Sequence, residues 1–196
     1  MIAFKGFNSR LSATMGKGTY QFEIGRTERT GASKTARNGF HCCENPFECM
    51  AYYPIGSSRY CMVEAGGSID EAEDAKISCT ELTPVKELSL KELAGYGMVY
   101  MIEHPKQKWQ QRHTKCVVCD DKADTNDDGI AIARGPYPKV RGRNGSILGM
   151  ILEPKPGRIK AARLVVVGSP GIKPGVWYTL TGSGLVKEAD NEKKAD

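Results

Sequence analysis

The stretch Gly39-Phe40-His41-Cys42-Cys43-Glu44-Asn45-Pro46-Phe47-Glu48 leads from an apolar segment into the start of a helix. Asn45 suits the N-cap position, because its side-chain oxygen can accept a backbone N–H of the first turn. Pro46 suits the first helical position, which needs no N–H, and Glu48 stands where a capping box places an acidic residue. The stretch therefore predicts a short helix over residues 46–53.

Strand-like segments surround this stretch on both sides. A second capping box, Ser89-Leu90-Lys91-Glu92, is followed by apolar residues at helical spacing as far as His104, and Pro105 then ends the pattern. The segments with strand-like patterns are residues 2–7, 20–24, 59–65 and 76–88. Helices mixed with strands in this way predict an α+β domain over residues 1–104.

The second half of the chain has a different texture, because glycine and proline interrupt short β-type runs. The candidate strands are residues 129–133, 139–141, 146–153, 159–167 and 176–180. We expect a mainly β part over 129–187, an irregular connector over 105–128 and a charged tail over 188–196. The fold class predicted for the whole chain is α+β.

Charge is distributed unevenly along the 196 residues. The net charge is +5, but residues 62–128 carry fourteen acidic and eight basic side chains. Residues 129–187 carry ten basic side chains and one acidic side chain, Glu153. A segment so biased toward one sign is typical of a surface that binds an acidic partner.

The composition excludes several classes of protein. Hydrophobic residues make up 40% of the chain and charged residues 26%, which fits a globular core and argues against wholesale disorder. The longest apolar runs, such as Leu164-Val165-Val166-Val167, are too short to cross a bilayer, so no membrane partner is expected. Seven cysteines without a secretion signal favour a reducing cytosol. The sequence contains no Walker loop, dinucleotide-binding fingerprint or nucleophile elbow.

Several short motifs together resemble a family of uncharacterised phage and prophage proteins. The resemblance lies in Phe4-Lys5-Gly6-Phe7, Tyr20-Gln21-Phe22-Glu23-Ile24-Gly25, Gly39-Phe40-His41-Cys42-Cys43-Glu44-Asn45-Pro46, Tyr52-Tyr53-Pro54, Arg59-Tyr60 and Lys86-Glu87-Leu88-Ser89-Leu90. In that family such a core often precedes repeats that resemble a small β-solenoid. Here residues 123–133 resemble one copy of the repeat and residues 139–180 resemble the C-terminal cap. The resemblance implies a phage or prophage accessory protein in the cytoplasm of a bacterial host cell, with no established activity.

The segment Gly39-Phe40-His41 and the aromatic helix after it also resemble a strand-to-helix element of ADP-ribosyltransferases. That resemblance implies a distantly ADP-ribosyltransferase-like first domain that would use NAD. The site residues would be Lys5 on the first strand, His41, Tyr52 beside the nicotinamide and Glu81 as the catalytic carboxylate. The alternative interpretation gives His41 a structural hydrogen bond and places Tyr52 in the core.

Two polar patterns suggest metal sites. In His113-x-x-Cys116-x-x-Cys119 the two thiolates and the imidazole could share a zinc ion, whereas the alternative is a pair of free thiols. The pattern Asp124-x-Asn126-x-Asp128-Gly129 matches the first half of a calcium-binding EF-hand loop. The twelfth position lacks the glutamate that completes such a loop, and a polar turn between strands is the alternative.

Basic residues with interleaved glycines characterise the second half of the chain. The candidate partner-binding residues are Arg134, Lys139, Arg141, Arg143, Arg158, Lys160 and Arg163. We expect Lys139, Arg141 and Arg143, which are spaced by two, to share one face of a strand. The alternative is a solvated surface that offsets the acidic segment 62–128.

These observations support two hypotheses of different class. The first is a non-enzymatic protein that needs no cofactor and binds an acidic macromolecule or an anionic ligand, with nucleic acid among the candidates. The second is an ADP-ribosyltransferase-like enzyme that uses NAD. The two differ in where the decisive residues lie, because the first depends on the basic residues and the second on a cleft in the first domain.

Overall fold

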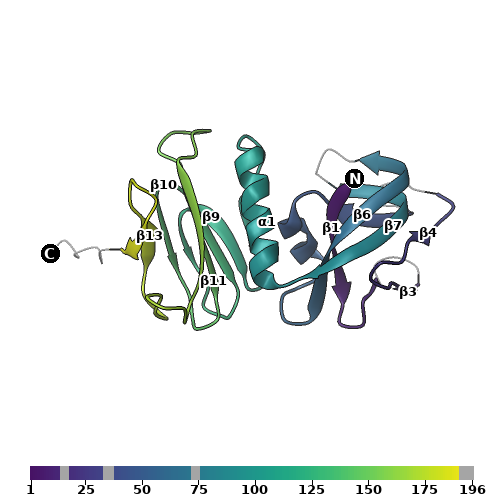
Figure 1. Cartoon of the computed structure of the whole chain (residues 1–196), viewed down its shortest axis with the longest axis horizontal. Coiled ribbons are helices and arrows are strands. Elements are labelled where there is room, and N and C mark those ends of the chain that lie inside the picture. Colours follow the sequence, from purple (N-terminus) through teal and green to yellow (C-terminus); the bar gives the residue numbers. More distant parts are fainter. Residues whose placement is uncertain (14–17, 33–37, 72–75, 190–196) are drawn as a thin grey trace. The chain divides into compact units, whose positions relative to one another are not determined.

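The computed structural model describes residues 1–13, 18–32, 38–71 and 76–189. Strands take up 50% of it and helical turns 11%, and α1 (Leu90–Glu103) is the one α-helix of the described chain (Figure 1). The predicted α+β class, with an ADP-ribosyltransferase-like first domain, is therefore wrong, because the fold is mostly β. The contacts between residues divide the chain into two units, Met1–Gly97 and Met98–Asp196.

Unit 1 is built on a sheet that closes on itself. Its four main strands are β1 (Ile2–Asn8), β5 (Phe40–Cys43), β6 (Ser58–Glu71) and β7 (Lys76–Leu88). β1 pairs with β5 and β6, and β7 pairs with the same two strands, so the ring β1-β6-β7-β5 is complete and barrel-like. The short strands of the unit are β2 (Ser12–Ala13), β3 (Tyr20–Gln21) and β4 (Glu28–Arg29). β4 pairs with β7, whereas β2 and β3 pair with each other.

The two helical predictions of the N-terminal half are confirmed in position. Asn45 caps a 3-10 helix, η1 (Pro46–Ala51), and its side chain accepts a hydrogen bond from the backbone N–H of Phe47 at 3.1 Å. In α1 the capping box forms as expected, since the backbone N–H of Glu92 donates to Ser89 and that of Ser89 donates to Glu92. Both signals act locally, and the strands that surround them decide the class of the fold.

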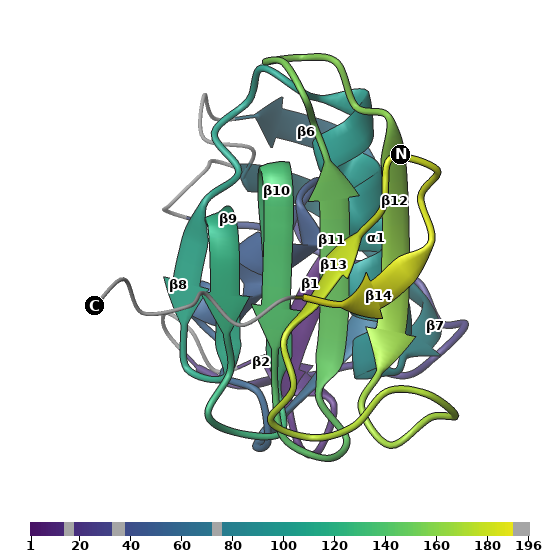
Figure 2. The same ribbon diagram turned by 90° about the vertical axis from the view of Figure 1, so that its left-hand side faces the viewer.

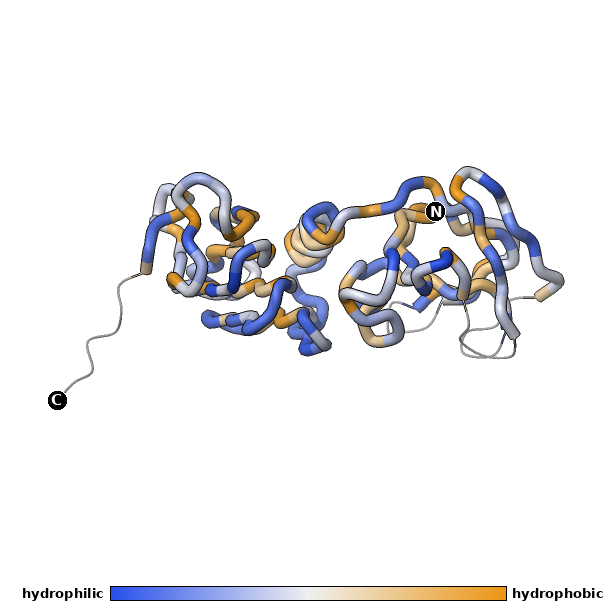
Figure 3. Tube along the Cα trace, turned by 90° about the horizontal axis from the view of Figure 1, so that it is seen from below, coloured by the Kyte–Doolittle hydropathy of each residue, from blue (hydrophilic) through white to orange (hydrophobic). Residues whose placement is uncertain are grey.

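The first part of α1 packs against η1 within unit 1. Gly97 is required at this contact, because a β-carbon there would lie 2.2 Å from the ring of Phe47. Leu93 and Ala94 are fully buried one turn earlier. Figure 3 shows the coil of α1 mostly in the colours of apolar residues. The contact agrees with the burial of Pro46, Phe47, Cys49 and Met50 within η1.

Unit 2 is a strongly curved sheet. Its strands are β8 (Gln111–His113), β9 (Cys116–Asp124), β10 (Ile130–Arg141), β11 (Ile147–Leu152), β12 (Ala161–Val166), β13 (Tyr178–Leu180) and β14 (Val186–Glu188). β8 to β12 lie side by side, with β13 and β14 in front of them in Figure 2. A hydrophobic core that includes Leu148, Met150, Tyr178 and Leu180 fills the space that these strands enclose.

β10 must bend for this topology to close. It runs parallel to both β9 and β11, so each connection must lead from the end of one strand back to the start of the next. These connections are short: residues 125–129 join β9 to β10, and residues 142–146 join β10 to β11. Five residues reach at most ~20 Å, whereas a straight strand of this length spans about 36–40 Å. The register of the β9–β10 pair shifts between Arg134 and Lys139, which marks the place of the bend.

Residues 105–128, predicted to be an irregular connector, contain β8 and β9. The reason is that both strands gain their hydrogen bonds from distant partners, β9 from β10 above all, and no local pattern shows such pairing. The division between the units falls at Gly97 and Met98, before that segment. Of the predicted charged tail 188–196, residues 190–196 lie outside the described residues. No helix of the described part is long and apolar enough to span a membrane.

Arg134 is buried, and it ties the end of α1 to the sheet of unit 2. Its exposed fraction is 2%, and two of its nitrogens donate to the Glu153 carboxylate at 2.7 and 2.8 Å. It also donates to the backbone oxygens of Met101 at 3.3 Å and Pro105 at 3.0 Å. The Trp109 ring lies 5.0 Å from the guanidinium carbon. Arg134, which the sequence predicted to bind a partner, is thus a structural residue. Its carboxylate partner Glu153 is distant in the sequence, so only the fold reveals the pair.

Replacing Glu153 with Gln should destabilise unit 2 by about 3 kcal/mol at pH 7, since a buried arginine would lose its counter-charge. The hydrogen bond from Arg134 holds the pKa of Glu153 below its usual value. The stability that this carboxylate contributes is therefore present at neutral pH and lost as the pH falls through that lowered pKa. Urea unfolding followed by tryptophan fluorescence measures the effect, because Trp109 and Trp177, the two tryptophans, both lie in unit 2.

The control is Glu188→Gln, which removes an exposed ion pair to Lys173. That change should cost less than about 1 kcal/mol. Equal unfolding midpoints for the two variants would contradict the role given to Arg134.

Candidate functional site

Lys5 and His41 are brought together inside unit 1. The Lys5 ammonium, on β1, donates to the backbone oxygen of His41 at 2.6 Å and lies 5.5 and 5.8 Å from the ring centres of Phe7 and Phe22. Burial lowers the pKa of Lys5. Burial and the nearby Lys5 charge lower the pKa of His41. The buried Nε2 atom of His41 has no hydrogen-bond partner among the described residues.

Tyr52 and Glu81 lie in other surroundings. Tyr52 follows η1 as its C-cap, is 42% exposed, and has the Lys76 ammonium 5.9 Å from its ring centre. Glu81, on β7, accepts a hydrogen bond from Arg29 at 3.1 Å. Of the four residues named for NAD chemistry, the structure joins Lys5 to His41 and pairs Tyr52 and Glu81 with other side chains.

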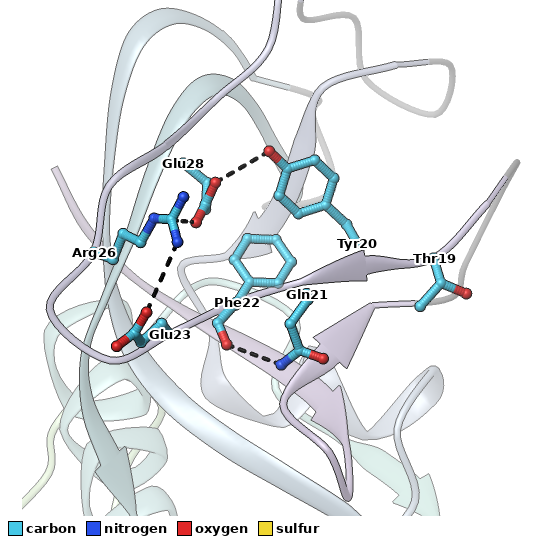
Figure 4. Close-up of a pocket in the computed structure, with 7 residues that line it drawn as sticks. All are labelled: Thr19, Tyr20, Gln21, Phe22, Glu23, Arg26 and Glu28. Atoms are coloured by element: carbon cyan, nitrogen blue, oxygen red, sulfur yellow. Dashed lines mark hydrogen bonds and ion pairs between the residues drawn. The ribbon is translucent and has the colours of Figure 1, made fainter.

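A surface hollow of unit 1 holds none of those four residues. It is lined by Thr19, Tyr20, Gln21, Phe22, Glu23, Arg26 and Glu28. Figure 4 shows the Arg26 guanidinium between the carboxylates of Glu23 and Glu28, at 3.8 and 3.1 Å. The Tyr20 hydroxyl donates to Glu28 at 3.1 Å. Two carboxylates face one guanidinium here, so the hollow does not favour an anionic dinucleotide.

Four cysteines of unit 1 form two hydrogen-bonded pairs close to Lys5. The Cys42 thiol donates to Cys79. This bond and burial raise the pKa of Cys42, whereas the same bond lowers the pKa of Cys79 against the opposing effect of burial. The Cys49 thiol donates in the same way to Cys43, which raises the pKa of Cys49. All seven cysteines of the chain are free thiols.

The predicted zinc ligands do not converge. His113 and Cys116 are cross-strand neighbours in the β8–β9 hairpin, but Nε2 of His113 is bonded to the Gln111 side chain at 2.6 Å. Cys116 and Cys119 are three residues apart in β9, and side chains alternate along a strand, so they lie on opposite faces. Burial raises the pKa of Cys116 to about 12, which opposes the thiolate that zinc requires. Across residues 1–13, 18–32, 38–71 and 76–189, no three potential ligands gather at one point.

The calcium-like loop is also occupied by other contacts. Asp124 accepts hydrogen bonds from Arg141, and Asp128 forms an ion pair with Lys115 at 2.6 Å. Thr125 closes the loop by donating to the backbone oxygen of Asp127 at 2.9 Å. The loop is a polar turn, as the alternative interpretation predicted.

The predicted basic residues occupy several places in unit 2 instead of one. Arg134 is buried, and Arg143 lies in the turn after β10. Arg158 and Lys160 lie in the segment before β12, and Arg163 lies on β12, where it donates to the backbone oxygen of Ala162. Only Lys139 and Arg141 share one strand face, because Val140 between them is buried in the core.

Cross-strand pairing builds a larger basic surface around these two residues. Lys139 on β10 is the direct neighbour of Lys122 on β9 and of Thr179 on β13. Thr179 is in turn the direct neighbour of Lys187 on β14. Direct neighbours share a face of the sheet, so three lysines and one threonine form a line across four strands. The adjacent line, which includes Ala123, Val140 and Tyr178, is buried and fixes the lysines toward solvent.

An aromatic ring lies beside this line of lysines. The Lys122 ammonium is 4.8 Å and the Arg141 guanidinium carbon 4.6 Å from the ring centre of Trp177. Cations so close to an indole ring are attracted to its π electrons, which orders their flexible side chains. We name Lys122, Lys139, Arg141, Trp177 and Lys187 the basic face.

Three members of the basic face were not predicted. Lys122 lies in the acidic segment 62–128, and Lys187 follows a glycine-rich turn. Trp177 is uncharged, so a pattern of basic residues does not include it. Only the register of β9, β10, β13 and β14 brings them together. A basic residue next to a buried alanine or valine, as at Lys122, Lys139 and Arg141, was the one local signal available for this face.

Comparison with known proteins bears on unit 1 alone. Residues 1–95 match DUF7666, a domain of unknown function. No curated protein and no solved structure matches the chain. The match is consistent with an uncharacterised family, and the basic face lies outside the matched residues.

Titration with Ellman's reagent at pH 8 should release about one equivalent at once from the native protein. Six of the seven cysteines are buried, and Cys119 alone is half-buried, so it should react first. The other thiols should react only after denaturant is added. Cys119→Ser should remove the fast equivalent, and two or more fast equivalents in the parent protein would contradict the buried thiol pairs.

Proposed function

We propose that the protein is a non-enzymatic binding protein whose basic face holds an acidic macromolecule. The observation that carries this proposal is the line of lysines at positions 122, 139 and 187, set at corresponding places on neighbouring strands. A line of cations along one surface matches a regular series of anionic groups better than it matches a single small anion.

The energetics of the line favour such a partner. Lys122 and Lys139 are directly opposite each other, and like charges at this position destabilise a strand pair. Asp124 accepts hydrogen bonds from Arg141, beside this pair of lysines. A bound polyanion would place its anionic groups along the line and release its own counterions, which gives the association its driving force.

We infer a setting as well. The resemblance of Phe4-Lys5-Gly6-Phe7 and of the Gly39–Pro46 stretch to phage and prophage proteins supports an accessory role in a bacterial host cell. The free thiol pairs Cys42/Cys79 and Cys43/Cys49 support the cytoplasm, which keeps thiols reduced. No observation unites Lys5, His41, Tyr52 and Glu81 in one cleft, so NAD chemistry is not proposed.

Replacing Lys122, Lys139 and Lys187 with Ser should lower the NaCl concentration at which the protein elutes from immobilised heparin. Each cation that contacts a phosphate or sulfate contributes roughly 0.9 to the slope of log affinity against log salt, so the slope should fall by about 2–3. The fold should persist, because surface substitutions usually cost less than about 0.5 kcal/mol.

The matched control replaces Lys91, Lys106 and Lys108, three exposed lysines outside the basic face, with Ser. Both triple variants change the net charge equally, so a difference between them reports position and not total charge. If the two variants elute together, or if the parent protein is not retained at low salt, the proposed function is wrong.

A further inference from the structure

Tyr137 is the most exposed of the large apolar side chains described. Its exposed fraction is 77%, against 65% for Leu185 and at most 55% for the others. It lies within β10, a strand whose first six residues are all buried. Exposing an aromatic ring to water is unfavourable in free energy, and a partner that covers the ring would remove that cost.

The residues at the bend in β10 hold the backbone so that the Tyr137 side chain is exposed to solvent. Asp121 on β9 adopts a left-handed conformation with φ of 48°, and its carboxylate accepts a hydrogen bond from the backbone N–H of Tyr137 at 3.5 Å. A β-carbon on Gly135 would lie 2.0 Å from that carboxylate, so only glycine permits the approach. Pro136 and Pro138 flank the tyrosine and restrict the backbone on both sides.

Tyr137 belongs to the same side of β10 as the basic face. From Tyr137 to Arg141 the residues are exposed, buried, half-buried, buried and half-buried in turn. Tyr137, Lys139 and Arg141 therefore alternate with the buried Pro138 and Val140. One continuous surface thus carries a free aromatic ring, the cation-flanked ring of Trp177 and the lysines of the basic face.

We propose that this surface binds single-stranded nucleic acid, with a base stacked on Tyr137 and the phosphates along the lysines. The proposal rests on the proposed function and makes its partner specific. Single strands offer both phosphates and open base faces, and proteins bind them by combining basic grooves with aromatic platforms. The bases of a duplex are already stacked on one another, and an acidic peptide offers carboxylates without flat rings to stack on Tyr137.

Fluorescence anisotropy with a labelled single-stranded oligonucleotide of about twelve thymidines tests the proposal. A duplex of the same length and poly-glutamate serve as competitors, and the parent protein should prefer the single strand to both. Tyr137→Ala should weaken binding of the single strand about 5- to 100-fold, the range of one base–aromatic stack. Tyr137→Phe should bind as the parent does, because the ring is kept.

Tyr52→Ala is the matched control, since Tyr52 is an exposed tyrosine of unit 1 and its loss should leave binding unchanged. Elution from heparin should be the same for Tyr137→Ala as for the parent, because no charge is removed. Equal single-strand affinity for Tyr137→Ala and the parent would overturn this inference, as would preferential binding of the duplex or of poly-glutamate. The proposed function would survive either result as long as the lysine triple variant still elutes early.

Discussion

The two five-residue connections on either side of β10 are too short for a straight strand, so β10 must bend. β10 must pair in parallel with β9 and β11 and then return toward its own beginning, so the bend at residues 135–138 is a condition of the whole topology of unit 2. The first arm of β10 is buried on both faces, whereas the second arm, after the bend, is buried on one face and half-buried on the other. Beyond the bend, Val140 still belongs to the core of unit 2, while Lys139 and Arg141 belong to the basic face.

Each unit contains a buried cation, and the two cations differ in the groups that surround them. Arg134 has a carboxylate partner and two backbone carbonyls, whose hydrogen bonds offset the loss of its hydration. Through these bonds it links the end of α1 to the sheet of unit 2. Lys5 has a backbone carbonyl, two aromatic rings and neighbouring thiols but no carboxylate among its partners in the described part of the chain, and burial lowers its pKa. The thiols remain paired by hydrogen bonds around it. Unit 1 therefore has a tightly packed polar interior whose groups mostly satisfy one another.

The family match and the basic face lie in different units. DUF7666 covers residues 1–95, whereas every member of the basic face lies after residue 98. A protein that shares the matched region need not share the lysines of unit 2. For this reason the binding proposal depends on the geometry of β9, β10, β13 and β14 and not on the match.

The sequence by itself determined the local features of this protein. The caps at Asn45 and Ser89 act over three residues, so they could be predicted, and the bias toward basic side chains after residue 129 is visible in the composition. Only the tertiary structure decided which charges meet. Arg134 and Glu153 are nineteen residues apart, and the line from Lys122 to Lys187 depends on three strand registers. A register that differs by one residue turns a side chain to the opposite face, and it is fixed by the packing of distant core residues such as Val140 and Tyr178. No pattern within a few residues of the chain contains that information.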